Sequence, residues 1–332
     1  MPGAGPTPGG GPPASPALVV VRGGALGDVL LGVPALRALR RRFPEHPLHL
    51  VAPQPQAGLL HHLGLAESAM AVDDPSLTPL FLEGRPLERL PALLRRAALA
   101  VVWLHGGDVI AANLARAGAR ETLYARALPD EGGAVHAADW LLQTLAPLGI
   151  AAPTDWDREP WLTVPPSTQE WAARWHQEEV GEGPYIVLHP GSGSARKNWP
   201  GAEWAATVRE YQRLTRLALV VVAGPADDGP LEALLGALPR QSWSPGRPDV
   251  VFRPPDLAQL AGILDRATLY LGNDSGVTHL AAALGRPTVA VFGPTDPALW
   301  RPRGPQVRVL GGRGRWPAAP EVTAAAADLL RG

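Results

Sequence analysis

Short apolar runs alternate along the chain with helix-length amphipathic segments. Runs that are apolar throughout are typical of strands buried on both faces of a parallel sheet, and the alternation with helices predicts right-handed crossovers. In the first half we expect strands at 18–22, 47–52, 69–73, 99–104 and 121–124, and helices at 28–43, 56–63, 86–97, 108–117 and 134–148.

The pattern restarts after a stretch at 150–184 that is rich in Pro, Trp and acidic residues and contains one expected helix at 167–179. In the second half the expected strands are 185–189, 217–223, 249–252, 268–271, 287–292 and 306–310, and the expected helices are 201–214, 228–237, 256–265, 275–285 and 318–331. The repeated pattern predicts two domains.

The predicted fold class is α/β, with two Rossmann-like, doubly wound parallel-sheet domains that face each other across a cleft. Ligands of such folds bind beyond the carboxyl ends of the strands, so we expect the binding and catalytic residues in the strand-to-helix loops at the cleft. We expect a flexible Pro/Gly-rich tail at 1–17, domains at 18–165 and 185–311, a connection at 166–184, and a C-terminal tail and helix at 312–332.

Composition narrows the class of protein. The 332 residues are 46% hydrophobic and 18% charged, which is too apolar for a disordered chain, and the net charge of −1 argues against nucleic acid as a partner. There are no cysteines, which excludes disulfides, zinc–thiolate sites and a cysteine nucleophile. The first residues do not resemble a secretory signal, and no apolar run approaches the ~18 residues of a membrane span, so we expect a soluble, cytoplasmic protein.

The first candidate loop is RGGALGDVLLGVPALRALRRRFP at 22–44. Asp28 stands where a helix begins after a strand. Such a residue is commonly an N-cap, but it can also present a carboxylate to the cleft. The glycine spacing does not form G-x-G-x-x-G, so a dinucleotide site is not supported. The basic cluster Arg37, Arg40, Arg41 and Arg42 is usually a solvated helix face, although it could attract a phosphorylated acceptor.

The second loop, HPGSGSARKNWP at 189–200, also lies between a strand and a helix. Its glycines and serines leave backbone N–H groups able to face an anion, and Lys197, the single lysine of the chain, adds a charge suited to a phosphate. Arg196 and Asn198 depart from the Walker A pattern. An exposed turn with an incidental lysine is the alternative.

The third loop lies in LGNDSGVTHLAAALGRPTVAVFGPTDPALWRP at 271–302. Asp274-Ser275-Gly276 leads into an Ala-rich helix whose start carries a partial positive charge suited to a phosphate. Asp274 could cap this helix or accept sugar hydroxyls, and His279 is commonly a surface or satisfied core residue. Two loops suited to bind an anion lie in the same domain, which indicates a ligand that contains a diphosphate.

The sequence motifs of other kinds of catalytic or metal site are absent or misplaced. No serine stands in G-x-S-x-G, and there is no H-E-x-x-H motif. Asp155-Trp156-Asp157 superficially matches the D-x-D metal site of some sugar transferases, but it lies in the proline-rich connection and we interpret it as structural.

Together the motifs LGDVLLGVPALRALRRRFP, HPGSGSARKNWP and GNDSGVTHLAAALGRPTVAVFGPTDP resemble glycosyltransferase family 9, the ADP-heptose–lipopolysaccharide heptosyltransferase family. The resemblance covers about residues 18–311, and the third motif is its most specific part. It implies a GT-B architecture in which the first domain binds the acceptor and the second binds the nucleotide-sugar. It also implies inversion at the anomeric carbon, no metal and no cofactor, and a C-terminal helix that packs back on the first domain.

The family motifs map onto single positions of this chain. The resemblance implies that Asp28 is the general base, that Lys197 contacts the donor diphosphate and that Asp274 contacts the donor sugar. Asp227 resembles a ribose-binding position, and Gly23-Gly24 stands where many relatives carry small hydroxyl residues. The remaining candidates are, for the donor, Ser192, Gly193, Ser194, Ser275, Gly276, Thr278 and His279, and, for the acceptor, Gly24, Arg37, Arg40 and Arg41.

The resemblance predicts transfer of a sugar, with heptose the leading candidate, from a nucleotide-diphosphate donor such as ADP-heptose. The acceptor would be a hydroxyl of the lipopolysaccharide core or of another envelope glycan, which allows peripheral membrane association at the inner face. Two alternatives stay open, a nucleotide-sugar epimerase of the same fold and a non-catalytic nucleotide-sugar-binding protein.

Overall fold

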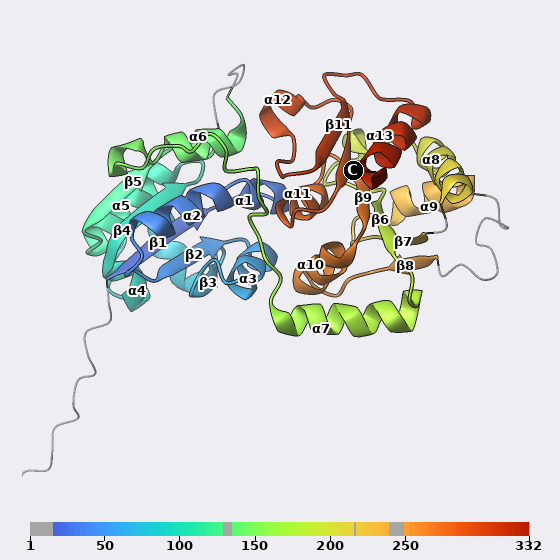
Figure 1. Ribbon diagram of the computed structural model, residues 1–332. Coiled ribbons are helices and arrows are strands. Elements are labelled where there is room, and N and C mark those ends of the chain that lie inside the picture. The colour runs from blue at the N-terminus through green and yellow to red at the C-terminus, as the bar shows by residue number, and fades with distance from the viewer. Residues whose placement is uncertain (1–15, 129–134, 216, 239–248, 332) are drawn as a thin grey trace, which may run out of the picture.

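The computed structural model describes residues 16–128, 135–215, 217–238 and 249–331. Two parallel sheets form two α/β domains that lie side by side (Figure 1). This confirms the predicted fold class. Most of the expected N-terminal tail, residues 1–15, lies outside the described residues.

The first domain is built on a five-stranded sheet of order β3-β2-β1-β4-β5. Alternate residues of its strands pack into two separate hydrophobic layers, with α2, α3 and α6 on one face and η1, α4 and α5 on the other. The strands are β1 (Ala17–Arg22), β2 (Leu48–Ala52), β3 (Ser68–Ala71), β4 (Ala97–Trp103) and β5 (Glu121–Tyr124). The helices are α1 (Leu26–Leu30), α2 (Val33–Arg42), α3 (Gln54–His62), the 3₁₀ helix η1 (Pro75–Phe81), α4 (Ala92–Arg95), α5 (Gly107–Ala117), α6 (Ala137–Gln143) and the 3₁₀ turn η2 (Ala146–Leu148).

The second domain has a six-stranded sheet of order β11-β10-β9-β6-β7-β8. One face packs against α10 and α11, and the other packs against α8, α9 and α13. The strands are β6 (Tyr185–His189), β7 (Ala218–Val222), β8 (Val250–Phe252), β9 (Leu269–Asn273), β10 (Thr288–Phe292) and β11 (Val307–Gly311). The helices are α7 (Pro166–Trp175), the π-helical turn η3 (His176–Val180), the 3₁₀ turn η4 (Ala195–Lys197), α8 (Gly201–Leu214), α9 (Asp228–Ala237), α10 (Leu257–Arg266), α11 (Gly276–Ala283), α12 (Pro297–Trp300) and α13 (Ala319–Arg331).

Prolines explain where the expected helices are too long. The helix expected at 28–43 is broken into α1 and α2, because Pro34 has no N–H to continue the ladder across the break. The helix expected at 86–97 shrinks to the single turn α4, which begins directly after Pro91.

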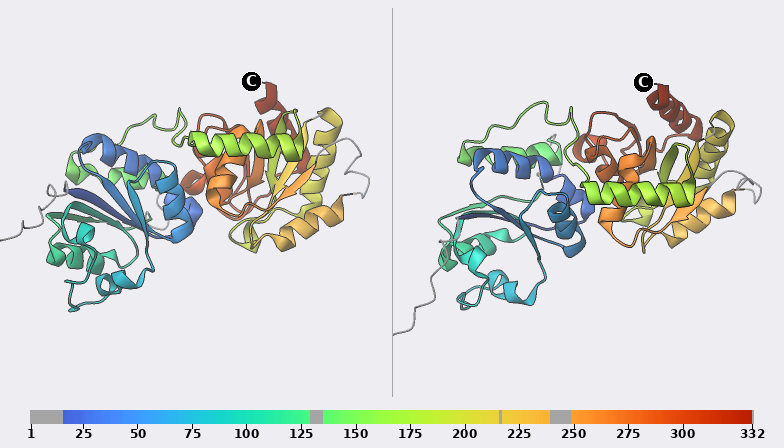
Figure 2. Two further views of the ribbon diagram at one scale, coloured as in Figure 1. Left: turned by 90° about the horizontal axis from the view of Figure 1, so that it is seen from below. Right: turned by 60° about the horizontal axis from the view of Figure 1, so that its bottom comes forward.

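The chain crosses between the domains after η2, and α7 then runs along the second domain beside α10 (Figure 2). Gly262 of α10 allows this contact, since a Cβ at that position would lie 2.9 Å from Thr168 Cγ2 and 3.1 Å from Ala172 Cβ.

The expectation that the C-terminal helix packs on the first domain is wrong. The helix α13 lies against α8 and the β9–β10 face of the second sheet, where Val322, Ala325 and Ala326 join that domain's core. Its apolar stripe is therefore already covered within its own domain. No helix among the described residues is long and apolar enough to cross a membrane.

Candidate functional site: the cleft between two switch points

Each sheet reverses its strand order at one point, between β1 and β4 in the first domain and between β6 and β9 in the second. Ligands of doubly wound sheets bind at such points. The loop that carries Asp28 follows β1, and the loops that carry Lys197 and Asp274 follow β6 and β9. All three sequence-predicted loops therefore belong to the two switch points.

A cavity of about 860 Å³ lies between the domains at this level. Its first-domain wall comes from the start of α1 and from α3, and its second-domain wall comes from the loops after β6 to β9. Five of the predicted donor residues line it, namely Ser192, Gly193, Asp227, Ser275 and Gly276. The volume suits a ligand of nucleotide-sugar size.

Asp28 is half-buried on the short helix α1. Ala25, rather than Asp28, occupies the N-cap, and the Asp28 Oδ2 atom reaches back to accept the Ala25 N–H at 2.9 Å. Among the described residues the Oδ1 atom makes no hydrogen bond, so one carboxylate oxygen supports the helix start while the other remains available to a ligand. Gly24 lies beside the Asp28 side chain and has a φ of 107°. A side chain would not fit there, because a Cβ atom at this position would lie 2.5 Å from Asp28 Cβ.

Arg22, a residue that sequence reasoning did not select, lies under this turn and is only 3% exposed. Its Nε and Nη2 atoms donate to the Asp28 carbonyl oxygen at 3.2 and 2.8 Å, and Nη1 donates to the Ala127 carbonyl oxygen at 3.1 Å. Burial lowers the pKa of Arg22 to about 10, which leaves the side chain charged at neutral pH. A buried arginine thus fixes the backbone that carries Asp28.

Lys197 and Asp274 form an ion pair, with 2.8 Å between Lys197 Nζ and Asp274 Oδ2. The Asp274 side chain is 6% exposed, whereas that of Lys197 is 34% exposed and can reach a ligand. Thr295, from the loop after β10, donates its hydroxyl to the same Asp274 oxygen at 2.7 Å. The structure therefore brings together the residue predicted to contact the donor diphosphate and the residue predicted to contact the donor sugar.

Helix α11 begins at the cleft, and its N-terminus meets α1 across the domain boundary (Figure 1). The contact is close because it is built on glycines. A Cβ at Gly276 would lie 2.6 Å from Leu26 Cβ, and one at Gly27 would lie 3.2 Å from His279 Cδ2. Ser275 caps α11 with its hydroxyl, which accepts the Thr278 N–H at 3.4 Å. The N–H groups at this helix start carry a partial positive charge.

His279 is buried at this contact and is neither a surface residue nor a fully satisfied core residue. It is 5% exposed, and its Nδ1 atom has no hydrogen-bond partner in the structure. Burial lowers the pKa of His279 to about 4, with Asp274 and Asp28 acting in the opposite direction and Lys197 in the same one. The ring is therefore neutral at pH 7 and lies within electrostatic reach of all three charged site residues.

Two buried residues that sequence reasoning missed hold the second-domain loops in place. Asn273 accepts the Trp199 N–H at 3.0 Å and donates to the carbonyl oxygens of Pro190 and Gly191. His189 lies 3.0 Å from Asp227 Oδ2 through Nε2 and 3.3 Å from Ser275 Oγ through Nδ1. The available signals were the scarcity of asparagine in the chain and the position of both residues at strand ends.

Asp227 lines the cavity, but its carboxylate is bound by the protein. Oδ2 accepts the Gly224 N–H at 2.6 Å in addition to the contact with His189. Burial acts to raise the pKa of Asp227, and the His189 contact, the Gly224 N–H and the charge of Arg253 outweigh it, so the pKa lies below its usual value.

The remaining donor candidates shape the loop after β6 and the core of the α11 start. Ser192 Oγ lies 2.7 Å from both the Ser194 carbonyl oxygen and Asn198 Oδ1, so it braces the turn around Gly193. Thr278 is fully buried, and its hydroxyl donates to the Asn273 carbonyl oxygen and contacts the Tyr270 hydroxyl. Thr278 therefore supports the helix start from within.

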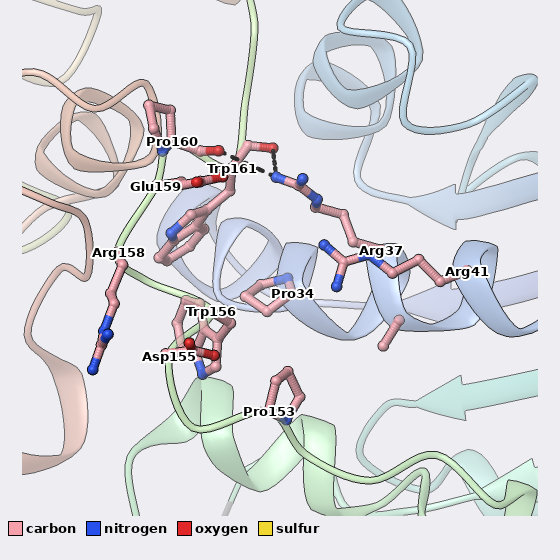
Figure 3. Close-up of a pocket in the computed structure, with 11 residues that line it drawn as sticks. Pro34, Arg37, Arg41, Pro153, Asp155, Trp156, Arg158, Glu159, Pro160 and Trp161 are labelled. Carbon is pink, nitrogen blue, oxygen red and sulfur yellow. Dashed lines mark hydrogen bonds between the residues drawn. The ribbon is translucent and has the colours of Figure 1, made fainter.

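The arginine candidates for the acceptor do not line the cleft cavity. Arg40 forms an ion pair with Glu67 at 2.7 Å, and Arg37 donates to the carbonyl oxygens of Pro160 and Trp161. Arg37 and Arg41 line a separate pocket beside the interdomain connection (Figure 3).

The motif Asp155-Trp156-Asp157 lies where the chain crosses between the domains, before the connection expected at 166–184, most of which is instead α7 and η3 on the second domain. Asp157 pairs with Arg303 of the second domain at 2.8 Å, and Trp156 Nε1 donates to Asp139 of the first domain, so the motif is tied to both domains. The described residues contain no group of three or more His, Asp or Glu side chains arranged to hold a metal ion.

Comparison with known proteins decides the family. The model of glycosyltransferase family 9 (heptosyltransferase) matches residues 138–327, more than half of the chain. The chain belongs to glycosyltransferase family 9. The matched range includes Lys197 and Asp274 but not Asp28.

Relatives of this family and solved structures agree with the assignment. Lipopolysaccharide heptosyltransferase 3 of Escherichia coli is 26% identical over 176 residues, which are 53% of this chain and 49% of that protein. The chain thus aligns with about half the length of this curated relative. The structure of E. coli ADP-heptose lps heptosyltransferase II matches with a TM-score of 0.75 at 20% identity, covering 95% of this chain and 98% of that one. An E. coli heptosyltransferase with ADP matches with a TM-score of 0.68 at 18% identity, covering 94% and 99%. These structures establish the GT-B fold.

Proposed function

We propose that this family 9 protein is a metal-independent, inverting glycosyltransferase that needs no cofactor. Its donor would be a nucleotide-diphosphate sugar, with ADP-heptose as the leading candidate, and its acceptor a hydroxyl of the lipopolysaccharide core or of another envelope glycan. It would act in the cytoplasm, at the inner face of the membrane that holds the acceptor. The names of two relatives, a lipopolysaccharide heptosyltransferase and a lipooligosaccharide heptosyltransferase, support this choice of substrates.

The observation that carries the proposal is the meeting of α1 and α11. Asp28 comes from the first domain, the Lys197–Asp274 pair comes from the second, and His279 lies within electrostatic reach of all three. An acidic group of the first domain and a cationic group of the second thus both lie near the domain boundary, next to a cavity that their chain neighbours Leu26 and Ser275 line but that Asp28 and Lys197 do not. Sugar transfer needs this pairing, since one reactant loses a proton while the other gains negative charge.

In the proposed reaction, Asp28 removes the proton of the acceptor hydroxyl as its oxygen attacks the anomeric carbon of the donor. The new bond forms opposite the diphosphate, which leaves with the electron pair of the broken bond, so the configuration inverts. A positioned general base of this kind accelerates a reaction typically about 10²–10⁴-fold. The backbone contacts of Arg22 hold Asp28 in place for this step.

The leaving diphosphate gains charge, and the second domain offers two groups that stabilise it. Lys197 can turn from Asp274 toward the phosphates because it is partly exposed, and the N–H groups at the start of α11 face the same cavity. Asp274 then becomes an acceptor for hydroxyls of the donor sugar, with Thr295 holding its other contact.

A direct assay tests the proposal and separates it from its alternatives. The purified protein is incubated with ADP-heptose and a heptose-deficient lipopolysaccharide core in EDTA, and ADP release and glycan mass are followed. We expect ADP release that depends on the acceptor, one added heptose and an inverted anomeric signal by NMR. Conversion of the donor without acceptor would indicate an epimerase, and binding without turnover of any tested nucleotide-sugar would indicate a non-catalytic protein. Activity restored only by Mg²⁺ or Mn²⁺ would contradict the metal-independent mechanism.

A further inference from the structure

A pocket of about 310 Å³ lies outside the cleft, between α2 and the interdomain connection. Neither the proposed chemistry nor the donor loops use it. Figure 3 shows its composition: arginines from α2 on one side, and indole and carboxylate groups from the connection on the other. We propose that this pocket binds a sugar that carries a phosphate or carboxylate group. We call it the hinge pocket.

The hinge pocket has the cations that such an anion needs. Arg37 is held in place by the Pro160 and Trp161 carbonyl oxygens at 3.2 and 2.9 Å through a single nitrogen, Nη1, so its other nitrogens remain available. Arg41 lies one turn further along α2 and makes no hydrogen bond or ion pair within the described residues. Both guanidinium groups lie on the same side of α2 (Figure 3). Two like charges held this close repel each other, and a bound anion would relieve the repulsion.

Burial lowers the pKa of Arg37, and the neighbouring charge of Arg41 lowers it further, while Glu159 acts in the opposite direction. Guanidinium groups bind phosphate and carboxylate through paired hydrogen bonds, which suits a fixed Arg37 next to a free Arg41. The other charged residues that line the pocket are Arg158, Asp155 and Glu159. The Arg158 guanidinium points away from Arg37 and Arg41 (Figure 3), so the two arginines of α2 are the cations placed to bind an anion.

The rest of the lining points to a sugar rather than to a bare anion. The indoles of Trp156 and Trp161 pack edge to face, with their ring centroids 4.6 Å apart. Together with Pro34 they form the apolar wall of the pocket. The C–H face of a pyranose packs on such a wall, while the carboxylates of Asp155 and Glu159 can accept its hydroxyl groups. The volume is at the low end for ligand pockets, which suits one monosaccharide and is small for a nucleotide.

The chain offers a matched set of variants for the test. Arg41→Gln removes one cation of the hinge pocket, and Arg42→Gln removes the next arginine of the same helix, which stacks on Phe43 and does not line the pocket. Lys197→Gln reports on binding in the cleft instead. Both helix variants are expected to fold, because their side chains are exposed.

The probe is glucose 6-phosphate, titrated by calorimetry, with inorganic phosphate, glucose and AMP as comparisons. We expect glucose 6-phosphate to bind more tightly than any of the three, and Arg41→Gln to weaken it by roughly tenfold. Arg42→Gln and Lys197→Gln should leave its affinity unchanged. Absence of binding, equal affinity for inorganic phosphate, tighter binding of AMP, or a loss caused by Lys197→Gln and not by Arg41→Gln would each overturn the proposal.

A second titration identifies the source of the sugar. Methyl glucoside 6-phosphate carries the same anion but has its anomeric oxygen capped, as in a glycan. Equal affinity for the two compounds assigns the hinge pocket to a residue of a glycan, and loss of affinity for the glycoside assigns it to a free sugar phosphate. Both results support an anionic sugar as the ligand. This inference does not depend on the proposed transfer reaction, because its readout is binding alone.

Discussion

The two domains present very different surfaces to the cleft. On the second domain the loops are tied together by buried polar contacts, in which Asn273 holds the turn after β6, His189 joins Asp227 to Ser275, and Thr295 supports Asp274. The first domain presents one carboxylate, the proposed general base Asp28, on a five-residue helix supported by Arg22. The proposed donor half is thus held in place by buried polar contacts, whereas the proposed acceptor half offers a single carboxylate on an anchored turn.

This difference indicates how the two halves are specialised. Preorganised dipoles and charges are most effective where charge develops on a group that is common to every turnover, such as a leaving diphosphate. A general base needs only correct position and protonation, so few residues suffice around it. The family model matches 138–327, which contains the whole second sheet and only the last part of the first domain. The match to the family is therefore concentrated in the second domain.

The largest predicted effect is that of Asp28→Asn. Asparagine keeps the size of the side chain and an oxygen that can accept the Ala25 N–H, but it cannot take a proton. We expect the transfer rate to fall about 10²–10⁴-fold, or about 2.7–5.5 kcal/mol of barrier, with little change in melting temperature. Turnover near that of the wild type, measured with saturating donor and acceptor, would return Asp28 to the role of a helix-start residue.

The second prediction concerns the loss of folding stability at acid pH. His279 and His136 are both buried at the domain boundary, where His136 Nε2 contacts the Arg301 carbonyl oxygen at 2.9 Å. Burial lowers the pKa of each to about 4. Below the ordinary pKa of 6.5 the unfolded chain binds protons that the folded chain cannot, until the pH reaches about 4. Stability is therefore complete above pH 6.5 and is lost between pH 6.5 and 4, by on the order of 3 kcal/mol for each histidine.

Urea unfolding at pH 7 and pH 5 measures this loss. In His136→Gln the difference between the two pH values should shrink, because one buried histidine no longer resists protonation. His105, which is exposed, provides the control, and His105→Gln should keep the full difference. The same pH dependence in all three proteins would show that buried histidines at the domain boundary do not cause the loss.

The smallest predicted effect is that of Arg40→Gln. The Arg40–Glu67 pair is exposed at both ends, and exposed ion pairs contribute about 0–1 kcal/mol. We expect the free energy of unfolding to change by less than about 1 kcal/mol and the KM for the acceptor to stay unchanged. A clear rise in that KM would assign Arg40 to the acceptor site, and the first domain would then contribute a second functional residue besides Asp28.

The sequence predicts local features of this protein better than contacts between distant segments. Apolar runs gave the strands, and the loops with Asp28, Lys197 and Asp274 were found because they lie where strands end. The partners of Arg37 are more than 120 residues away, and Asn273 acts on a loop 74 to 83 residues before it, so no local pattern could indicate either. The place of α13 was taken from the family resemblance and was wrong, and the sequence could not have corrected it, because an amphipathic stripe shows that a helix packs but not against which domain.

The division of labour between the two halves can be tested most directly by titrating ADP into the wild type, Asp28→Asn and Lys197→Gln by calorimetry. Lys197→Gln removes a charge-assisted contact worth about 1.5–3 kcal/mol but keeps a donor for Asp274, so ADP should bind roughly ten- to hundredfold more weakly. Asp28→Asn should bind ADP as the wild type does. Unchanged affinity in Lys197→Gln, or an equal loss in both variants, would contradict the assignment of the diphosphate to the second domain and of proton removal to the first.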